Sequence, residues 1–310
     1  MSDFFQSRDC LEFYRSLSFL EPFYFEVRRE GEVKASVVGY IQKDGGALKR
    51  FLSRRAIING GPYLAPDATK ADLTELLALC KKGLKGKAIY IESRNFEDYS
   101  LWKDGFEEAG FRYEPHYNFQ IDTTTLETAE ANLGKSRKRD IRTSLRDGAR
   151  VIEHPSEEQV LAYYGLLQKL YSSKIKTPLF PAEFFLRLNQ QPYGKLLLVE
   201  LEGRIIGGTI LACGRNSVYE WFVCGEDGVY KNIFPSTLAT WAGIDFAAKG
   251  PWKCFDMMGA GAPGDGGYGV RDFKAKFGGK LVEYGRFRCL LEPGLYRIGK
   301  IGVRLMKKWG

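Results

Sequence analysis

Residues 196–213, LLLVELEGRIIGGTILAC, contain the pattern that decides how this chain folds. Two apolar runs flank Glu202-Gly203, and they predict an antiparallel hairpin because a glycine after a polar residue supplies the positive φ of a tight turn. Residues 23–40, FYFEVRREGEVKASVVGY, repeat this pattern about 172 residues earlier, with the turn at Glu30-Gly31. The chain therefore contains an internal repeat.

A second pair of segments supports the repeat. In each copy a buried strand, a helix, a glycine and a final strand follow one another, at 88–92, 101–109, Gly110 and 112–121, and again at 253–257, 270–276, Gly278-Gly279 and 280–290. Other helices are predicted over 7–18, 70–83, 157–173, 182–189 and 236–248. This order predicts two similar mixed α/β domains, and 310 residues are enough for both to have a core.

Composition narrows the class of protein. Hydrophobic residues make up 44% and charged residues 27%, as in ordinary globular proteins. No apolar run approaches the ~18 residues of a membrane span, and the N-terminus has no basic region typical of a signal peptide. The six cysteines form no C-x-x-C pair and there are two histidines, which disfavours zinc sites, disulfides and nucleophilic triads. We therefore expect a cytoplasmic protein without a metal.

The formal charge of +8 is concentrated in two short segments. Residues 131–150 carry +5 and residues 271–310 carry +8, so the rest of the chain is net acidic. The first segment predicts a basic helix over 133–146, ended by Gly148, that joins the two copies. A local excess of cations favours an anionic partner, although two solvated helix faces would explain it equally well.

The order of elements, read twice, resembles tandem domains of the GNAT acyltransferase fold. Residues 268–279, YGVRDFKAKFGG, resemble the FKxxFGG signature of FemABX-type transferases, and residues 255–259, FDMMG, resemble the D-x-x-G strand end before it. The resemblance covers nearly the whole second half and is weaker in the first. It implies helices on both faces of mixed, mostly antiparallel sheets, with domain 1 at 1–132, a joining helix at 133–150 and domain 2 at 151–290. The tail at 291–310 is expected to pack on domain 1.

The resemblance also implies acyl transfer to an amine, with aminoacyl-tRNA as the donor and a peptidoglycan precursor as the acceptor. The carbonyl oxygen gains charge in such a reaction and needs a positive neighbour. The family's lysine maps onto Lys274, with Phe273 beside it as a second catalytic candidate. The residues alone also allow Lys274 to be one of four cations on an exposed helix face over 271–280. No dedicated general base stands out, and proton transfer by the substrate itself stays open.

Six residues are candidates for substrate binding. They are Arg271, Tyr268, Asp256, Tyr219, Trp221 and Phe180. Asp256 ends a strand, where a carboxylate either acts on the substrate or caps the next turn. Phe180 stands where the best-known branch of the family has an arginine for a UDP-linked acceptor, so a UDP-muramyl peptide is disfavoured. The aromatic strand over 219–222 could contact the acceptor or belong to the core.

The donor and the basic segments complete the expectations. Residues 225–236 lack the glycine pattern with which coenzyme A enzymes of this fold hold a pyrophosphate, so acyl-CoA is the less favoured donor. A tRNA backbone could bind the outward cations of the joining helix if Leu133, Ile141 and Leu145 bury its other face. Those cations are Lys135, Arg137, Lys138, Arg139 and Arg142. In the tail, only Lys307-Lys308-Trp309 is predicted to contact the inner face of a membrane.

Three functions stay open from the sequence. The first is a FemABX-like aminoacyltransferase acting on a cell-envelope precursor. The second is a GNAT N-acyltransferase that uses acyl-CoA or an acyl carrier protein on an envelope sugar or small amine. The third is a non-catalytic binding protein of the same fold. No tightly bound cofactor is expected for any of them.

Overall fold

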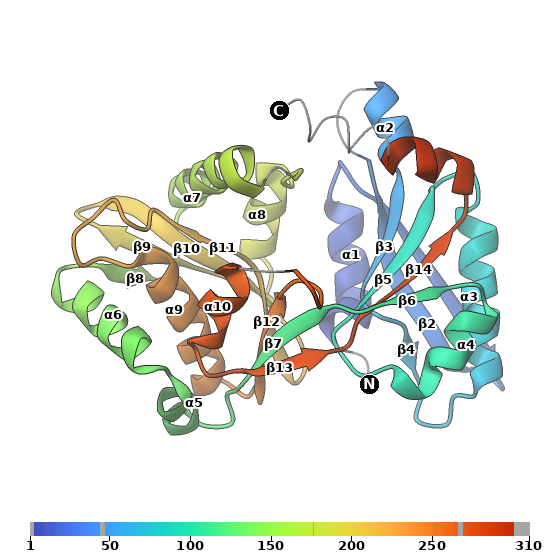
Figure 1. Ribbon diagram of the computed structural model, residues 1–310, viewed down its shortest axis with the longest axis horizontal. Helices are drawn as coiled ribbons and strands as arrows, with labels where there is room; N and C mark the ends of the chain where they lie inside the picture. Colours follow the sequence, from blue (N-terminus) through green and yellow to red (C-terminus); the bar gives the residue numbers. More distant parts are fainter. Residues whose placement is uncertain (1–2, 44–46, 176, 266–268, 301–310) are drawn as a thin grey trace. The chain divides into compact units, whose positions relative to one another are not determined.

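The computed structural model describes residues 3–43, 47–175, 177–265 and 269–300, and for residues 47–49 only the backbone. The chain divides into two compact units (Figure 1). Unit 1 combines Met1–His116 with Glu283–Gly310, and unit 2 is Tyr117–Val282. The predicted boundaries at 132 and 290 therefore differ from the observed ones. The joining helix belongs to unit 2, because Leu133 and Ile141 are buried in the core of that unit.

In the described part of unit 1, seven strands form one mixed sheet in the order β1-β2-β3-β5-β14-β6, with β4 paired to β2. The strands are β1 (Glu21–Arg29), β2 (Glu32–Gln42), β3 (Arg55–Gly60), β4 (Tyr63–Leu64), β5 (Tyr90–Asn95), β6 (Arg112–Glu114) and β14 (Arg286–Leu290). The helices are α1 (Arg8–Ser16), α2 (Ala47–Ser53), α3 (Lys70–Leu84) and α4 (Lys103–Glu108), with short 3-10 turns at Phe4–Gln6 and Ser100–Trp102. Helix α1 covers one face of the sheet, and α3 and α4 cover the other (Figure 1).

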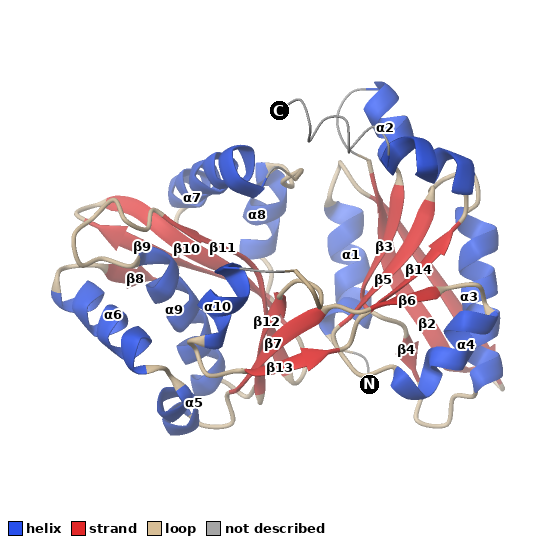
Figure 2. Ribbon diagram, in the orientation of Figure 1, coloured by secondary structure: helices blue, strands red, loops and turns tan. Residues whose placement is uncertain are grey.

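Unit 2 repeats this architecture, with described strands in the order β13-β7-β12-β11-β10-β9-β8. The strands are β7 (Tyr117–Asp122), β8 (Arg150–Ile152), β9 (Gly194–Leu201), β10 (Arg204–Cys213), β11 (Ser217–Gly225), β12 (Cys254–Gly259) and β13 (Lys280–Glu283). Helices α7 (Glu157–Leu170) and α8 (Ala182–Asn189) lie on one face of the sheet, and a π turn at Tyr171–Ile175 follows α7. The other face carries α5 (Leu126–Asn132), α6 (Lys135–Arg146), α9 (Pro235–Lys249) and α10 (Gly269–Ala275), as Figure 2 shows.

Both predicted hairpins are confirmed. Glu30 and Gly31 have φ of 53° and 85°, and Glu202 and Gly203 have φ of 51° and 78°. Two consecutive positive φ angles give a turn whose twist matches that of the flanking strands. The pairs β3–β5 and β11–β12 are parallel, whereas the two hairpins and β2–β3, β5–β14 and β7–β12 are antiparallel. The predicted mixed, mostly antiparallel sheets with helices on both faces are therefore confirmed.

The predicted single strands over 112–121 and 280–290 are wrong, because each of them is two strands in different sheets. The first breaks at Pro115, which has no N–H to donate, into β6 of unit 1 and β7 of unit 2. The second breaks at Gly285, where φ is 63°, into β13 of unit 2 and β14 of unit 1. The two copies thus exchange strands. In the sheet of unit 1, β14 from the second copy lies between β5 and β6. In the sheet of unit 2, β7 from the first copy lies between β12 and β13.

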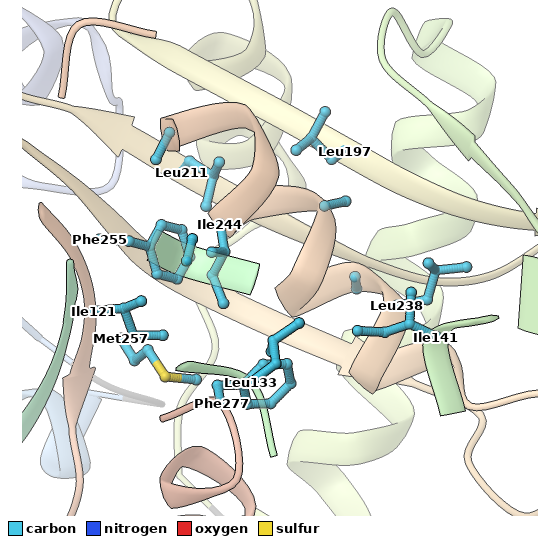
Figure 3. Close-up of a cluster of buried hydrophobic side chains, with 14 of the residues drawn as sticks. Ile121, Leu133, Ile141, Leu197, Leu211, Leu238, Ile244, Phe255, Met257 and Phe277 are labelled. Carbon is cyan, nitrogen blue, oxygen red and sulfur yellow. The ribbon is translucent and has the colours of Figure 1, made fainter. Parts of the chain in front are cut away.

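Helix α6 packs on the core of unit 2 with a different stripe from the predicted one. Ile141 is buried and joins Leu238 and Phe277 in one apolar cluster, which Figure 3 shows. Leu145, predicted to share that face, has 47% of its surface exposed. The buried positions of α6 are 137, 140, 141 and 144, which follow helical spacing, so the turn from 144 to 145 carries Leu145 outward.

The tail of the chain is described up to residue 300. Tyr296 packs edge-on against Tyr90 of β5 with ring centroids 5.5 Å apart, so this part of the tail contacts unit 1. The proposed membrane contact, Lys307-Lys308-Trp309, lies outside the described residues. Within the described residues, no helix has both the length and the apolar composition needed to cross a bilayer.

Candidate functional site

The sheet of unit 2 is irregular where β11 and β12 separate. Their parallel register joins Ser217–Tyr219 to Cys254–Asp256 and, for the described residues, goes no further. Beyond this point β11 has an extra residue, Trp221, because Ile210 faces Phe222 while the next residue of β10 faces Glu220. On β12 the register with β7 shifts after Asp256, and Met258 has a φ of 57°. Bulges and positive φ angles of this kind are common next to active sites.

Lys274 of α10 fills this opening with its ammonium group. Its Nζ donates to the main-chain oxygen of Met257 and, at 2.8 Å, to that of Gly259. These carbonyls belong to the part of β12 that has left its parallel neighbour, so the lysine supplies donors that the strand pairing does not. Only 7% of Lys274 is exposed, and the interpretation of an exposed cation on a helix face is therefore wrong.

Two buried carboxyl groups accompany the lysine. Burial raises the pKa of Glu220 to about 7 and that of Asp256 to about 6, although the charge of Lys274 opposes both shifts. Burial lowers the pKa of Lys274, against the opposing effect of the two carboxylates. Three ionisable groups whose pKa values are shifted by burial in one place are typical of a functional site.

The two carboxyl groups differ in their hydrogen bonds. Asp256 accepts from Gln120 Nε2 at 3.2 Å and from the Met258 N–H at 2.6 Å, so it also holds the bulge of β12. Glu220 accepts from Thr209 Oγ1 at 3.5 Å, its Oε2 has no hydrogen-bond partner within bonding distance among the described atoms, and the nearby Thr240 hydroxyl acts to lower its pKa. Glu220 was not among the predicted residues. Its signal in the sequence is a single carboxylate in the otherwise apolar strand VYEWFV, where a buried charge is unusual.

This arrangement can support the chemistry of acyl transfer. An ammonium has three N–H donors and two of them go to carbonyls of β12, which leaves one for an oxygen that gains negative charge. A carboxyl group with a pKa near neutrality can accept the proton that an attacking amine loses. Lys274, Glu220 and Asp256 thus combine an electrostatic stabiliser with candidate bases, and we call these three residues the splay site.

The other predicted substrate residues have different positions. Arg271 donates to the main-chain oxygens of Ala260 and Ala262, at 3.1 and 2.8 Å, so it ties α10 to the loop after β12. Tyr268 lies outside the described residues. Tyr219 is buried and is the register partner of Asp256.

Trp221 and Phe180 belong to an aromatic cluster under α8. Both rings pack against Phe184, with centroids 4.8 and 4.9 Å away. The ring of Phe180 also lies 6.1 Å from that of Phe222. Phe180 is buried, so the position that carries an arginine in the best-known FemABX branch is here part of the core.

Phe273 and Arg137 form a second buried contact. The Arg137 guanidinium lies over the rings of Phe273 and Phe277, at 4.5 and 5.0 Å from their centroids, and pairs with Asp140 at 3.5 Å. Its Nη2 also donates to the main-chain oxygen of Phe273 at 3.3 Å. Arg137, predicted to face a tRNA phosphate, is therefore buried between α6 and α10. The other predicted cations of the helix, Lys135, Lys138, Arg139 and Arg142, are exposed.

The start of α9 is capped by the protein itself. The Ser236 N–H donates to the Asp227 carboxylate at 3.1 Å, and the Phe234 N–H donates to Ser144 Oγ at 3.0 Å. Both N–H groups belong to residues 225–236, the segment that lacks the predicted glycine pattern for a pyrophosphate. The six cysteines are free, and no group of three or more His, Cys, Asp or Glu residues in the described chain could hold a metal ion.

Comparisons with known proteins agree with this architecture. Residues 135–274 match the family model described as an acetyltransferase (GNAT) domain. No curated protein sequence matches the chain. Among solved structures, FemX has a TM-score of 0.73 at 14% identity, covering 96% of this chain and 94% of that chain.

Two further structures resemble the chain over most of its length. The C-terminal domain of a putative lysylphosphatidylglycerol synthetase from Agrobacterium fabrum has a TM-score of 0.60 at 14% identity, covering 94% of this chain and 88% of its own. A tandem GNAT protein from the clavulanic acid biosynthesis pathway has a TM-score of 0.53 at 10% identity, covering 88% and 84%. The predicted FemABX-like tandem GNAT fold is therefore confirmed.

Proposed function

We propose that this protein is a FemABX-like acyltransferase that moves an aminoacyl or related acyl group onto an amine of a cell-envelope component. The observation that carries the proposal is the buried ammonium of Lys274 at the opening between β11 and β12. It lies in the segment that matches a GNAT acetyltransferase domain. A charge held in a buried place acts on a developing oxyanion more strongly than one in water.

The reaction needs a group that accepts a proton from the amine. Glu220 is the first candidate, because burial raises its pKa to about 7 and its Oε2 has no partner among the described atoms. Asp256 is more constrained, since it already accepts from Gln120 and from the Met258 N–H. We therefore assign Lys274 to the carbonyl oxygen and Glu220 to the proton, with Asp256 holding β12 in shape.

Aminoacyl-tRNA is the donor that we favour, at the cytoplasmic face of the membrane. Two of the similar structures are named FemX and lysylphosphatidylglycerol synthetase, and the second name refers to an aminoacylated lipid. The capped start of α9 supports a donor other than coenzyme A, since the Ser236 N–H donates to Asp227 and the Phe234 N–H donates to Ser144. The exposed cations of α6 offer a surface for tRNA phosphates.

An acyl-CoA donor is the second candidate, and the match to a GNAT acetyltransferase domain favours it. Isothermal titration of the full chain with coenzyme A separates the two donors. Micromolar binding would favour acyl-CoA, and no binding at millimolar coenzyme A supports the tRNA donor.

The transfer itself is tested with the purified full chain. Aminoacyl-tRNAs charged with radiolabelled amino acids are incubated with extracted lipid-linked wall precursors, and the label on the precursor is counted. We expect Lys274→Met to reduce transfer by about 100-fold or more, which is typical for the loss of one oxyanion donor. Lys276→Met, on an exposed residue two positions further, is the matched control and should keep transfer within about 2-fold of the unchanged protein.

The two variants give a clear contradiction of the proposal. Full activity of a folded Lys274→Met protein would exclude Lys274 from the reaction. Absence of transfer by the unchanged protein from both tRNA and acyl-CoA donors would favour the non-catalytic binding protein.

A further inference from the structure

The strand exchange assembles a cluster of arginines in unit 1 that the proposed reaction does not use. Arg94 of β5 is the register partner of Arg286 of β14, and Arg288 is the partner of Glu92. The alternate residues of β14, Phe287 and Cys289, are buried in the core under α3 and α4. Because side chains alternate along a strand, the three arginines lie on the opposite face of the sheet. We call Arg94, Arg286 and Arg288 the arginine cluster.

One buried carboxylate is shared by all three guanidinium groups. Glu92 accepts from Arg94 Nε at 2.7 Å, from Arg286 Nη1 at 3.3 Å and from Arg288 Nη2 at 2.6 Å. Arg288 pairs with Glu114 as well, at 2.8 Å. Burial alone would raise the pKa of Glu92, but Arg94 and the other arginines hold it at about 2. The single negative charge of Glu92 is therefore shared among three guanidinium groups.

Positive charge remains in excess after these pairings. Burial and the neighbouring Arg94 lower the pKa of Arg286 to about 10, although Glu92 opposes the shift. The Nη2 of Arg286 lies 2.9 Å from His116 Nε2, a ring nitrogen that brings no negative charge. The buried Nε of Arg288 has no hydrogen-bond partner among the described atoms. Like charges directly opposite on neighbouring strands destabilise a sheet, and the Glu92 carboxylate that Arg94 and Arg286 share also accepts from Arg288.

We propose that the arginine cluster binds the phosphate or diphosphate group of a small molecule or of a lipid headgroup. Guanidinium groups match phosphate oxygens with paired N–H donors, and a phosphate brings up to two charges where a carboxylate brings one. The side chains of Arg94, Arg286 and Arg288 are 31%, 27% and 20% exposed, so they are open to a ligand yet partly shielded from water. The proposal does not depend on acyl transfer, since no residue of the splay site takes part in it.

Calorimetric titration of the full chain with inorganic pyrophosphate tests the proposal. We expect binding that weakens by about 10-fold or more in Arg286→Gln and in Arg94→Gln, the usual cost of a charged hydrogen-bond partner. Arg28→Gln is the matched control, because Arg28 is an exposed arginine of the same sheet that pairs with Glu26. It should bind pyrophosphate like the unchanged protein.

A second variant and a second ligand make the result decisive. Glu92→Gln removes the internal anion and should tighten pyrophosphate binding, whereas a purely structural cluster would only lose thermal stability. Sedimentation with phosphatidylglycerol vesicles, compared with phosphatidylcholine vesicles, separates a lipid phosphate from a soluble one. No binding of either ligand by the unchanged protein, or equal affinity in folded Arg286→Gln and Arg28→Gln, would overturn the proposal.

Discussion

Glu220→Gln should make the protein more stable at pH 8 than the unchanged protein is. Glutamine has nearly the same size as glutamate and can still accept from Thr209, but it has no charge to bury. Burial raises the pKa of Glu220 from 4.5 to about 7, so the folded protein resists ionisation of this group more than the unfolded chain does. The carboxylate is therefore a cost to folding wherever it is ionised.

The size of this cost follows from the two pKa values. At 1.36 kcal/mol per pKa unit, the difference between 4.5 and about 7 corresponds to about 3 kcal/mol. Below pH 4.5 the group is protonated in both states and the cost is absent. It grows as the pH rises from 4.5 and is complete above pH 7. The unchanged protein should lose about 2 to 3 kcal/mol between pH 5 and pH 8 that Glu220→Gln keeps.

Urea unfolding followed by tryptophan fluorescence measures the effect at both pH values. The quantity of interest is the change in free energy of unfolding from pH 5 to pH 8, compared between the two proteins, because the contribution of Asp256 is present in both. Glu158→Gln, an exposed carboxyl of α7, is the matched control and should leave the pH dependence unaltered. The same pH dependence in Glu220→Gln and in the unchanged protein would refute a neutral, buried Glu220.

Two further predictions concern packing in unit 2. Arg137→Met removes a buried cation from two phenyl rings and leaves Asp140 paired with the exposed Arg139, so we expect a loss of about 1 to 2 kcal/mol in urea unfolding. Arg142→Met, on the exposed side of α6, should change stability by less than about 0.5 kcal/mol, and equal losses would contradict the buried position. Gly278→Ala adds a Cβ that would clash with the main-chain oxygen of Asn132 in α5 at a φ of 81°, and it should cost more than Gly203→Ala, which has a similar φ and open space. Thermal denaturation compares the two, and a similar loss in both would show that the close approach to α5 has no effect.

Local patterns were enough to predict most of the fold. Glu202-Gly203 and Glu30-Gly31 adopt the positive φ angles that their sequence requires, and residues 182–189 form the predicted helix α8. These features depend on neighbours in the sequence. The strand exchange depends instead on which sheet accepts each half of residues 112–121 and 280–290. Pro115 is the local sign of a break in the first of these segments. The strand-forming residues on both sides of it nevertheless predict one continuous strand.

The candidate site was predicted less completely than the fold. The family resemblance identified Lys274, but its burial and its contacts with β12 depend on the separation of β11 from β12. The sequence predicts Arg137 among the exposed cations because the apolar stripe alone defines the inner face of α6, whereas the guanidinium lies over the rings of Phe273 in α10 and Phe277 just after it. Glu220 was missed because a carboxylate gains a shifted pKa only from burial, which one strand's sequence does not reveal.

The strand exchange also explains what the positive charge of residues 271–310 does. In the sequence this charge is one block, which would suggest one basic surface. The chain leaves unit 2 after Val282 and enters unit 1 at Glu283, so Lys274 lies before the crossing and Arg286 and Arg288 lie after it. Lys274 is then buried beside Glu220 and Asp256, and the two partly exposed arginines pair with Glu92. One run of cations thereby supplies two separate anion sites, one suited to an oxyanion and one to a phosphate, and neither resembles the solvated face that the charge count alone would predict.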